Sequence, residues 1–247
     1  MSPFQAYLHN FLFSYYPYLC LTVFLVGSLI RFDRDQYTWK SDSSQMLRKR
    51  SLRWGSILFH IGILFLFFGH LVGLLTPHWI YENFISPQHK QLLAIYSGGA
   101  AGAVCFIGLS LLLYRRVFDP RIRLTSHRTD IAILVILWVQ LLLGLITLPI
   151  SLKHTDGSVM LVLSDWAQRV LTFRAGAADN LVNLDWPYKI HLVLGMTIFL
   201  LFPFSRLVHV WSGFASLAYV FRPYQVVRAR RLNLPPGHNA PPTRKPR

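Results

Sequence analysis

Four histidines stand inside two long apolar stretches of this sequence, residues 53–77 and 189–211. They are His60, His70, His191 and His209. Histidine binds metals and carries protons, but an ionisable side chain within a membrane-spanning helix is costly unless it faces the bundle interior and has a partner. We therefore expect the histidines of one stretch to meet those of the other.

The spacing of these histidines decides which metal chemistry they can support. His60 and His70 are about 15 Å apart along a helix, so they cannot bind one ion together. His191 and His209 are about 27 Å, or about five whole turns, apart on a continuous helix, which puts both on one face. Zinc and copper sites usually draw ligands from close sequence pairs, whereas a solitary histidine is typical of an axial haem ligand.

We accordingly predict two bis-histidine sites for haem. The sequence contains no C-x-x-C-H motif, so the haem would be bound noncovalently, as haem b. The alternative is that the histidines bond neighbouring helices or line a proton path.

Composition places the chain among membrane proteins. Of its 247 residues, 53% are hydrophobic and 14% are charged, and the mean hydropathy is +0.39. The net charge of +15 does not indicate nucleic-acid binding, because Lys and Arg fall in short loops between apolar runs. Cys20 and Cys105 lie in predicted spans and provide no disulfide framework. The N-terminus lacks the features of a cleaved signal peptide, so we expect its first apolar run to be kept as an anchor.

Five apolar runs predict an all-α integral membrane bundle of five transmembrane helices that enclose two haems. The predicted spans cover residues 11–30, 54–76, 91–114, 131–150 and 189–211. They form one domain over residues 1–232, and a basic, Pro-rich tail over residues 233–247 is expected to be disordered. Residues 162–170, V-L-S-D-W-A-Q-R-V, predict a short amphipathic helix at the membrane interface.

The distribution of Lys and Arg predicts the orientation of this bundle in the cell (inner) membrane. Loops 31–53 and 115–130 and the C-terminal tail are rich in Lys and Arg, whereas the first 30 residues contain neither. The positive-inside rule then places the N-terminus outside, or in the periplasm, and the C-terminus in the cytoplasm.

This topology also sets the pairing of the histidines. The second and fifth helices are antiparallel, so His70 meets His191 near the outer face and His60 meets His209 near the inner face. The axial rise is about 15 Å from His60 to His70 and about 27 Å from His191 to His209. Helix tilt would have to compensate for this difference.

Small and basic residues close to the histidines fit haem binding. Four glycines within one turn of a histidine leave room for a flat macrocycle, although helix packing at small residues explains them equally. They are Gly62, Gly69, Gly73 and Gly195. Arg206, one turn from His209, is a candidate partner for haem propionates at the inner side, and a snorkelling arginine is the other interpretation.

The sequence is similar to a known family over residues 4–232. The matching strings include R-F-D-R-D-Q-Y-T-W-K, L-F-H-I-G-I-L, G-H-L-V-G-L-L-T-P-H-W, S-G-G-A-A-G and H-L-V-L-G-M-T-I-F-L-L-F-P-F-S-R-L-V-H-V-W. They closely resemble the respiratory nitrate reductase gamma subunit, a five-helix dihaem cytochrome b. The resemblance is specific because it covers loops as well as apolar runs.

The resemblance implies roles for individual residues. For the outer, distal haem and the inner, proximal haem it implies the ligand pairs His70 with His191 and His60 with His209. It also implies quinol oxidation beside the outer haem, with Lys90 hydrogen-bonded to the quinone oxygen. From the residues alone, Lys90 is read as an interfacial anchor. Gly69 is a further candidate, for close packing at the haem or quinol site.

Together these features predict an electron conduit. Quinol is oxidised near the outer face, and electrons pass through two haems to cytoplasmic partners. The resemblance identifies these partners as an iron–sulfur beta subunit and a molybdenum-containing alpha subunit that reduces nitrate. The chain has no iron–sulfur cysteine motif, so the nitrate-reducing site of this oxidoreductase belongs on a partner chain.

Two alternatives stay open. One is a dihaem cytochrome b of another quinone-linked complex, such as a formate dehydrogenase or a heterodisulfide-reductase-like complex. The other is a metal or proton transporter that uses paired histidines.

Overall fold

Helices make up the regular structure of the described chain. The computed structural model describes residues 1–35 and 49–212, and these residues contain no β-strand. Residues 36–48, and residues 213–247 with the predicted tail, lie outside this description. In chain order the elements are α1 (Pro3–Asn10), η1 (Phe11–Tyr15), α2 (Tyr16–Arg34), α3 (Lys49–Leu75), α4 (His78–Tyr81), α5 (Pro87–Phe118), α6 (Pro120–Leu124), α7 (Arg128–Ser151), α8 (Ser158–Leu171), η3 (Asp179–Leu181), α9 (Trp186–Leu201), η4 (Phe202–Phe204) and η5 (Arg206–Val208).

Within residues 1–35 and 49–212, five helical stretches are long and apolar enough to cross a membrane, which is the number that the sequence predicted. They run over Pro3–Arg34, Leu52–Leu75, Pro87–Phe118, Arg128–Ser151 and Trp186–Phe204. The third is longer than predicted, because the Ser86 side chain caps α5 four residues earlier and brings Lys90 into the helix. At its other end α5 includes Arg115 and Arg116, both buried, so their assignment to a loop is wrong.

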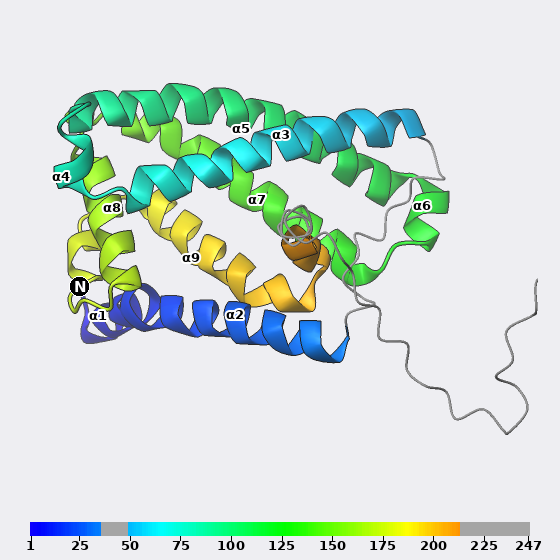
Figure 1. The fold of residues 1–247 in the computed structure, drawn as a ribbon, viewed down its shortest axis with the longest axis horizontal. Helices are drawn as coiled ribbons and strands as arrows, with labels where there is room; N and C mark the ends of the chain where they lie inside the picture. Colours follow the sequence, from blue (N-terminus) through cyan, green and yellow to red (C-terminus); the bar gives the residue numbers. More distant parts are fainter. Residues whose placement is uncertain (36–48, 213–247) are drawn as a thin grey trace, which may run out of the picture. The chain divides into compact units, whose positions relative to one another are not determined.

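The long helices pack in a series, which Figure 1 shows from one side. α3 lies along α5, α5 against α7, α7 against α9, and α9 against α2. Glycine makes the α3–α5 contact close: a Cβ on Gly62 would lie 2.5 Å from the Cβ of Cys105, and one on Gly108 would lie 2.3 Å from the Phe59 amide nitrogen. Gly62 therefore serves helix packing instead of leaving room for a macrocycle.

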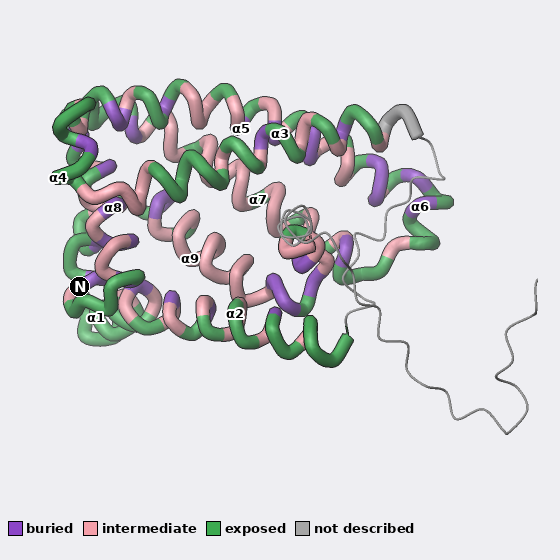
Figure 2. Tube along the Cα trace, viewed as in Figure 1, coloured by how far each residue is buried: buried purple, intermediate pink, exposed green. Residues whose placement is uncertain are grey.

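An apolar cluster lies where α8 and the following loop meet the first helical stretch. Its buried members are Phe13, Trp166, Ala167, Val170, Ala177, Ala178 and Leu181. The Trp166 Nε1 donates to the Phe13 carbonyl oxygen at 3.0 Å and ties the two parts together. α8 confirms the predicted amphipathic helix, and its buried positions stand out in Figure 2, whereas α3 is mostly exposed or half-buried.

The fifth span is not one continuous helix. α9 ends at Leu201, and the short 3-10 turns η4 and η5 follow, separated by Ser205 in an extended conformation with φ −121° and ψ 176°. Pro203 explains the break, because proline has no amide hydrogen for a helical bond and its ring clashes with the preceding turn. The prediction of a continuous helix over residues 189–211 is therefore wrong, and the rise of about 27 Å that it implied no longer applies.

α2 holds this break in place. The Arg31 Nη1 donates to the carbonyl oxygens of Pro203 at 2.7 Å and Ser205 at 2.8 Å. Gly27 leaves the space that the proline ring occupies, since a Cβ there would lie 2.9 Å from the Pro203 Cγ. Carbonyl groups that the broken helix cannot use are thus satisfied by a side chain from a neighbouring helix.

Candidate functional site

The structure brings the four predicted histidines together in two pairs. His60 of α3 faces His209, which follows η5, with the ring centroids 6.4 Å apart. His70 of α3 faces His191 of α9, with the ring centroids 6.3 Å apart. These are the two combinations that antiparallel helices predicted.

Both distances suit a metal ion held between two rings. A histidine nitrogen binds a transition metal at about 2 Å, so two such bonds through Nε2 would set the ring centroids about 6 Å apart. Two imidazoles joined by a direct hydrogen bond of about 2.9 Å would lie closer, with centroids about 5 Å apart. The rings of each pair are therefore spaced for an atom between them.

The hydrogen bonds of the four imidazoles involve Nδ1 in every ring, and in His191 the Nε2 also lies 3.4 Å from the Gln140 Nε2. In every case Nδ1 lies within bonding distance of a backbone carbonyl oxygen. The acceptors are Ser56 for His60 at 2.7 Å, Leu66 for His70 at 2.7 Å, Gln140 for His191 at 3.1 Å and Arg206 for His209 at 2.6 Å. A carbonyl oxygen can only accept, so Nδ1 carries the proton and Nε2 keeps the lone pair that a metal requires.

α7 carries no histidine of the two pairs, yet it supports His191 closely. The Gln140 Nε2 donates to the His191 carbonyl oxygen at 3.1 Å and lies 3.4 Å from the His191 Nε2, and the Gln140 backbone carbonyl oxygen accepts from the ring Nδ1 at 3.1 Å. A Cβ on Gly144 would lie 3.0 Å from the His191 Cε1, so only glycine gives the ring this place. Sequence reasoning missed both residues, although a polar Gln140 in the middle of an apolar span was a usable signal.

The other glycines near the histidines have different surroundings. A Cβ on Gly73 would lie 3.5 Å from the Met160 Cε, and one on Gly195 would lie 3.1 Å from the Gln140 Nε2. A Cβ on Gly69 meets no atom within 4 Å among the described residues. Gly69 instead lines an open apolar hollow of about 570 Å³ on α3, together with Ile61, Leu64, Phe65, Phe68 and Val72.

Lys90 lies in the first turns of α5 and is buried, with 8% of its surface exposed. Its Nζ lies 3.5 Å from the centroid of the Tyr81 ring, a cation–π contact that α4 provides. Neither this Nζ nor the Tyr81 hydroxyl has a hydrogen-bond partner within the part of the chain that the structure describes. Burial, with a smaller effect of the Glu82 carboxylate, raises the pKa of Tyr81, so its hydroxyl keeps its proton. Two contacting side chains thus each carry a buried donor for which the described residues supply no acceptor.

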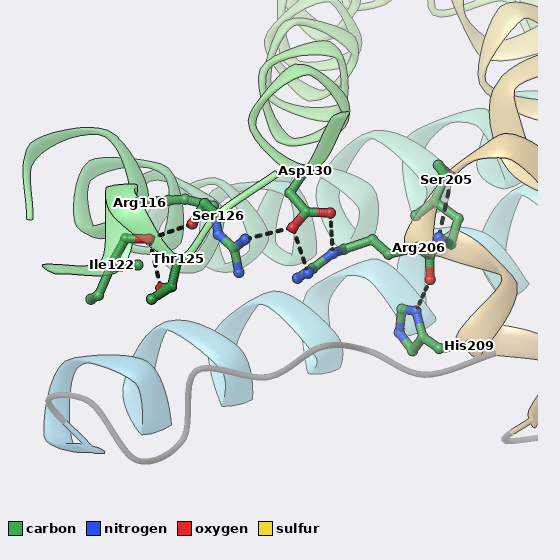
Figure 3. Close-up of polar contacts among 9 residues, drawn as sticks. Arg116, Ile122, Thr125, Ser126, Asp130, Ser205, Arg206 and His209 are labelled. Carbon is green, nitrogen blue, oxygen red and sulfur yellow. Dashed lines mark hydrogen bonds and ion pairs between the residues drawn. The ribbon is translucent and has the colours of Figure 1, made fainter. Parts of the chain in front are cut away.

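Arg206 is engaged by a carboxylate. Its Nε and Nη2 donate to the two oxygens of Asp130 at 2.9 and 2.8 Å, and Arg116 Nη1 donates to the same carboxylate at 3.0 Å (Figure 3). Haem propionates and solvent were the predicted partners of Arg206, and Asp130 was not predicted. The sequence did contain an indication, because Asp130 is a lone carboxylate at the start of an apolar span and a charged side chain there normally has a partner.

The fold and these pairs define a multi-pass membrane protein whose helices bring histidines together in pairs, with His60 and His70 exposed and His191 and His209 half-buried. The family model of the nitrate reductase gamma subunit matches residues 9–230 of the chain. The respiratory nitrate reductase 1 gamma chain of Escherichia coli (strain K12) is 51% identical over 226 residues, which cover 92% of this chain and 100% of that protein.

Two further relatives agree. The respiratory nitrate reductase 2 gamma chain of Escherichia coli (strain K12) is 53% identical over 225 residues, covering 91% of this chain and 99% of the relative. The nitrate reductase gamma chain of Bacillus subtilis (strain 168) is 37% identical over 215 residues, covering 87% of this chain and 95% of the relative. The chain belongs to the nitrate reductase gamma subunit family and is a subunit of respiratory nitrate reductase, an oxidoreductase complex. Membership implies association with other nitrate reductase subunits.

Proposed function

We propose that this chain binds two b-type haems, one between His70 and His191 and one between His60 and His209. The observation that supports this most directly is the common geometry of the two pairs: ring centroids 6.3 and 6.4 Å apart, and every Nδ1 bonded to a carbonyl oxygen. Bound haem would supply a one-electron carrier in each half of the membrane. The protein's contribution is to fix the tautomer and direction of four imidazoles before the cofactor arrives.

We propose that quinol is oxidised at the outer end of the bundle, with Lys90 as the residue that binds its oxygen. A buried ammonium group without an acceptor is costly, so its presence favours a ligand that completes its hydrogen bonds. The Tyr81 ring below the ammonium group lowers this cost and fixes its position. A quinol hydroxyl or quinone carbonyl oxygen is the kind of acceptor that this arrangement accommodates.

The electrons are proposed to leave on the cytoplasmic side, to an iron–sulfur beta subunit and then a molybdenum-containing alpha subunit that reduces nitrate. Support comes from charge: the end of the bundle near His60 and His209 carries Arg116, Arg121, Arg123 and Arg128, and cationic segments favour the cytoplasm. Inward electron transfer from an outer quinol site moves charge across the membrane, at about 2.3 kcal/mol per electron per 100 mV.

The direct test is the haem content of the purified chain and of its histidine variants. We expect two noncovalent haems per chain and a reduced-minus-oxidised spectrum with a b-type α-band. His70→Ala and His191→Ala should remove one spectral component, and His60→Ala and His209→Ala the other. His78→Ala is the matched control, because His78 pairs with Glu82 outside both sites.

Two results would contradict this assignment. A purified chain without b-type absorption would favour a metal or proton transporter that uses the paired histidines. Loss of the same component in His60→Ala and His70→Ala would leave haem binding intact but refute the pairing.

A further inference from the structure

The segment that carries His209 is separated from α9 by an irregular stretch. After the break at Pro203, Ser205 in an extended conformation and one 3-10 turn, Arg206–Val208, precede His209, where residues 209–212 are helical again. The Ser205 Oγ accepts a hydrogen bond from the Leu207 amide at 3.2 Å, which caps this single turn. Because this stretch is not continuous with α9, contacts with other elements contribute to the direction of the His209 ring.

Asp130 provides such a contact from the first turn of α7. Its carboxylate accepts three hydrogen bonds, two from Arg206 and one from Arg116 (Figure 3). All three side chains are buried or nearly so, with 9% of Asp130, 10% of Arg116 and 17% of Arg206 exposed. Two parallel bonds from one guanidinium group fix its plane as well as its position.

Arg206 connects this carboxylate to the histidine. Its side chain is bound by Asp130, and its backbone carbonyl oxygen accepts the His209 Nδ1 proton at 2.6 Å. Figure 3 shows the continuous path from Asp130 through Arg206 to His209. The same bond gives His209 the tautomer that keeps the lone pair on Nε2.

We propose that Asp130 is a positioning residue for the His60–His209 site: by holding Arg206 it orients His209 for metal binding. The inference rests on the proposed haem-binding role of His209. It assigns a function in the site to α7, which supplies no ligand. Arg116 of α5 assists by binding the same carboxylate. Residues of α5, α7 and η5 thus act together to orient the His209 imidazole.

The competing role for Arg206 is a direct bond to a haem propionate, and the two roles predict opposite effects of Asp130. If Arg206 served propionates, removal of the Asp130 charge would release the guanidinium group and strengthen haem binding. If Asp130 orients His209, removal of the Asp130 charge weakens haem binding. The two side chains should also act as a unit. The double variant Asp130→Asn/Arg206→Gln should therefore lose little more affinity for the inner haem than either single variant.

The test compares Asp130→Asn, Asp130→Glu, Arg206→Gln, Arg206→Lys and the double variant Asp130→Asn/Arg206→Gln in the full chain. Haem content and the midpoint potential of each haem are measured, with His209→Ala as the reference for complete loss of the inner component. We expect the inner haem to be retained roughly 10- to 100-fold more weakly in Asp130→Asn, the usual effect of removing a partner of a metal ligand. The outer haem should keep its content and potential.

Asp165→Asn is the matched control, because it also removes a carboxylate bound to an arginine, Arg169, but on α8. Arg206→Lys should resemble Arg206→Gln, since an ammonium group cannot supply two parallel bonds, and Asp130→Glu should recover part of the inner haem. If the Asp130→Asn variant does not accumulate, the Arg206→Lys variant tests the proposal in its place. Retention of the outer haem in that variant shows that the chain has folded.

The outcomes separate this inference from the proposed function. A wild-type chain without haem would overturn both. A wild-type chain with two haems, together with an inner haem unchanged or more tightly bound in Asp130→Asn and Arg206→Lys, would overturn the role of Asp130 alone. Additive effects of the two single variants would refute the proposed path through Arg206.

Discussion

His60 and His209 face each other with their ring centroids 6.4 Å apart, although one lies on a regular helix and the other follows a proline break. Their meeting depends on elements that contain neither histidine. α2 binds the carbonyl groups of the break through Arg31, and α7 binds Arg206 through Asp130. The four histidines were visible in the sequence, whereas Gln140 and Asp130, which support His191 and the Arg206–His209 segment, both lie on α7.

Gly144→Ala should disturb the His70–His191 site. The added Cβ would lie 3.0 Å from the His191 Cε1, closer than ordinary van der Waals contact, so the ring must shift by a few tenths of an ångström. We expect a cost of about 1–3 kcal/mol, typical of overpacking, and a change in the outer haem spectrum with the inner haem unaffected. Spectra and thermal unfolding of the purified chain would measure both. Gly98→Ala is the control, because a Cβ there meets nothing within 4 Å, and an equal effect in both variants would refute the steric argument.

Lys90→Ala should impair quinol oxidation without removing either haem. Loss of one charge-assisted hydrogen bond to a buried ligand costs about 1.5–3 kcal/mol, or roughly ten- to a hundredfold in binding. Nitrate reduction with an artificial donor that feeds the cytoplasmic subunits directly should persist. Lys153→Ala, which changes an exposed lysine, should behave as wild type. Normal quinol-dependent turnover and inhibitor affinity in Lys90→Ala would leave the quinol site unassigned.

The ring of Tyr81 should matter for quinol binding through its contact with Lys90. Tyr81→Leu removes the aromatic face below the ammonium group, and a cation–π contact contributes about 0.5–2 kcal/mol, so affinity should fall by roughly two- to thirtyfold. Tyr81→Phe keeps the face and removes a hydroxyl that has no partner within the described residues. Titration with a quinol-analogue inhibitor should therefore rank wild type and Tyr81→Phe above Tyr81→Leu. An equal loss in both variants would point to the hydroxyl, acting as a second donor to the quinol.

The orientation in the membrane can be tested with reporter fusions. An enzyme active only in the cytoplasm should work when fused after Arg231, and one active only after export should work when inserted after Phe84, which lies in the exposed turn between α4 and α5. Ser86 is avoided as an insertion point because it caps α5. The opposite pattern would place the Lys90 end in the cytoplasm and reverse the proposed direction of charge movement.

The five spans and the two histidine combinations followed from the sequence because both depend on patterns that a single chain displays: apolar runs of sufficient length, and the alternating direction of successive helices. The break at Pro203 did not follow, since a proline inside an apolar run is compatible with a kinked span as well as with an ended helix. The partner of Arg206 was missed for a different reason. Asp130 lies 76 residues away, and only packing reveals that the two meet.

Lys90 shows a third limit of sequence reasoning. Its position at the edge of an apolar run suggested an anchor at the interface, and the Ser86 cap that extends α5 determines that it is buried instead. Helix boundaries are set by caps, and a shift of a few residues changes whether a charge meets water or protein.

The proline break also means that the two histidines of the fifth span are connected differently to the rest of the protein. His191 lies on α9, whereas His209 begins a second helical stretch, residues 209–212, that the 3-10 turns η4 and η5 separate from α9. A ligand that binds only the folded form stabilises that form by mass action, so a haem bound between His60 and His209 would also stabilise the position of this second stretch against α3.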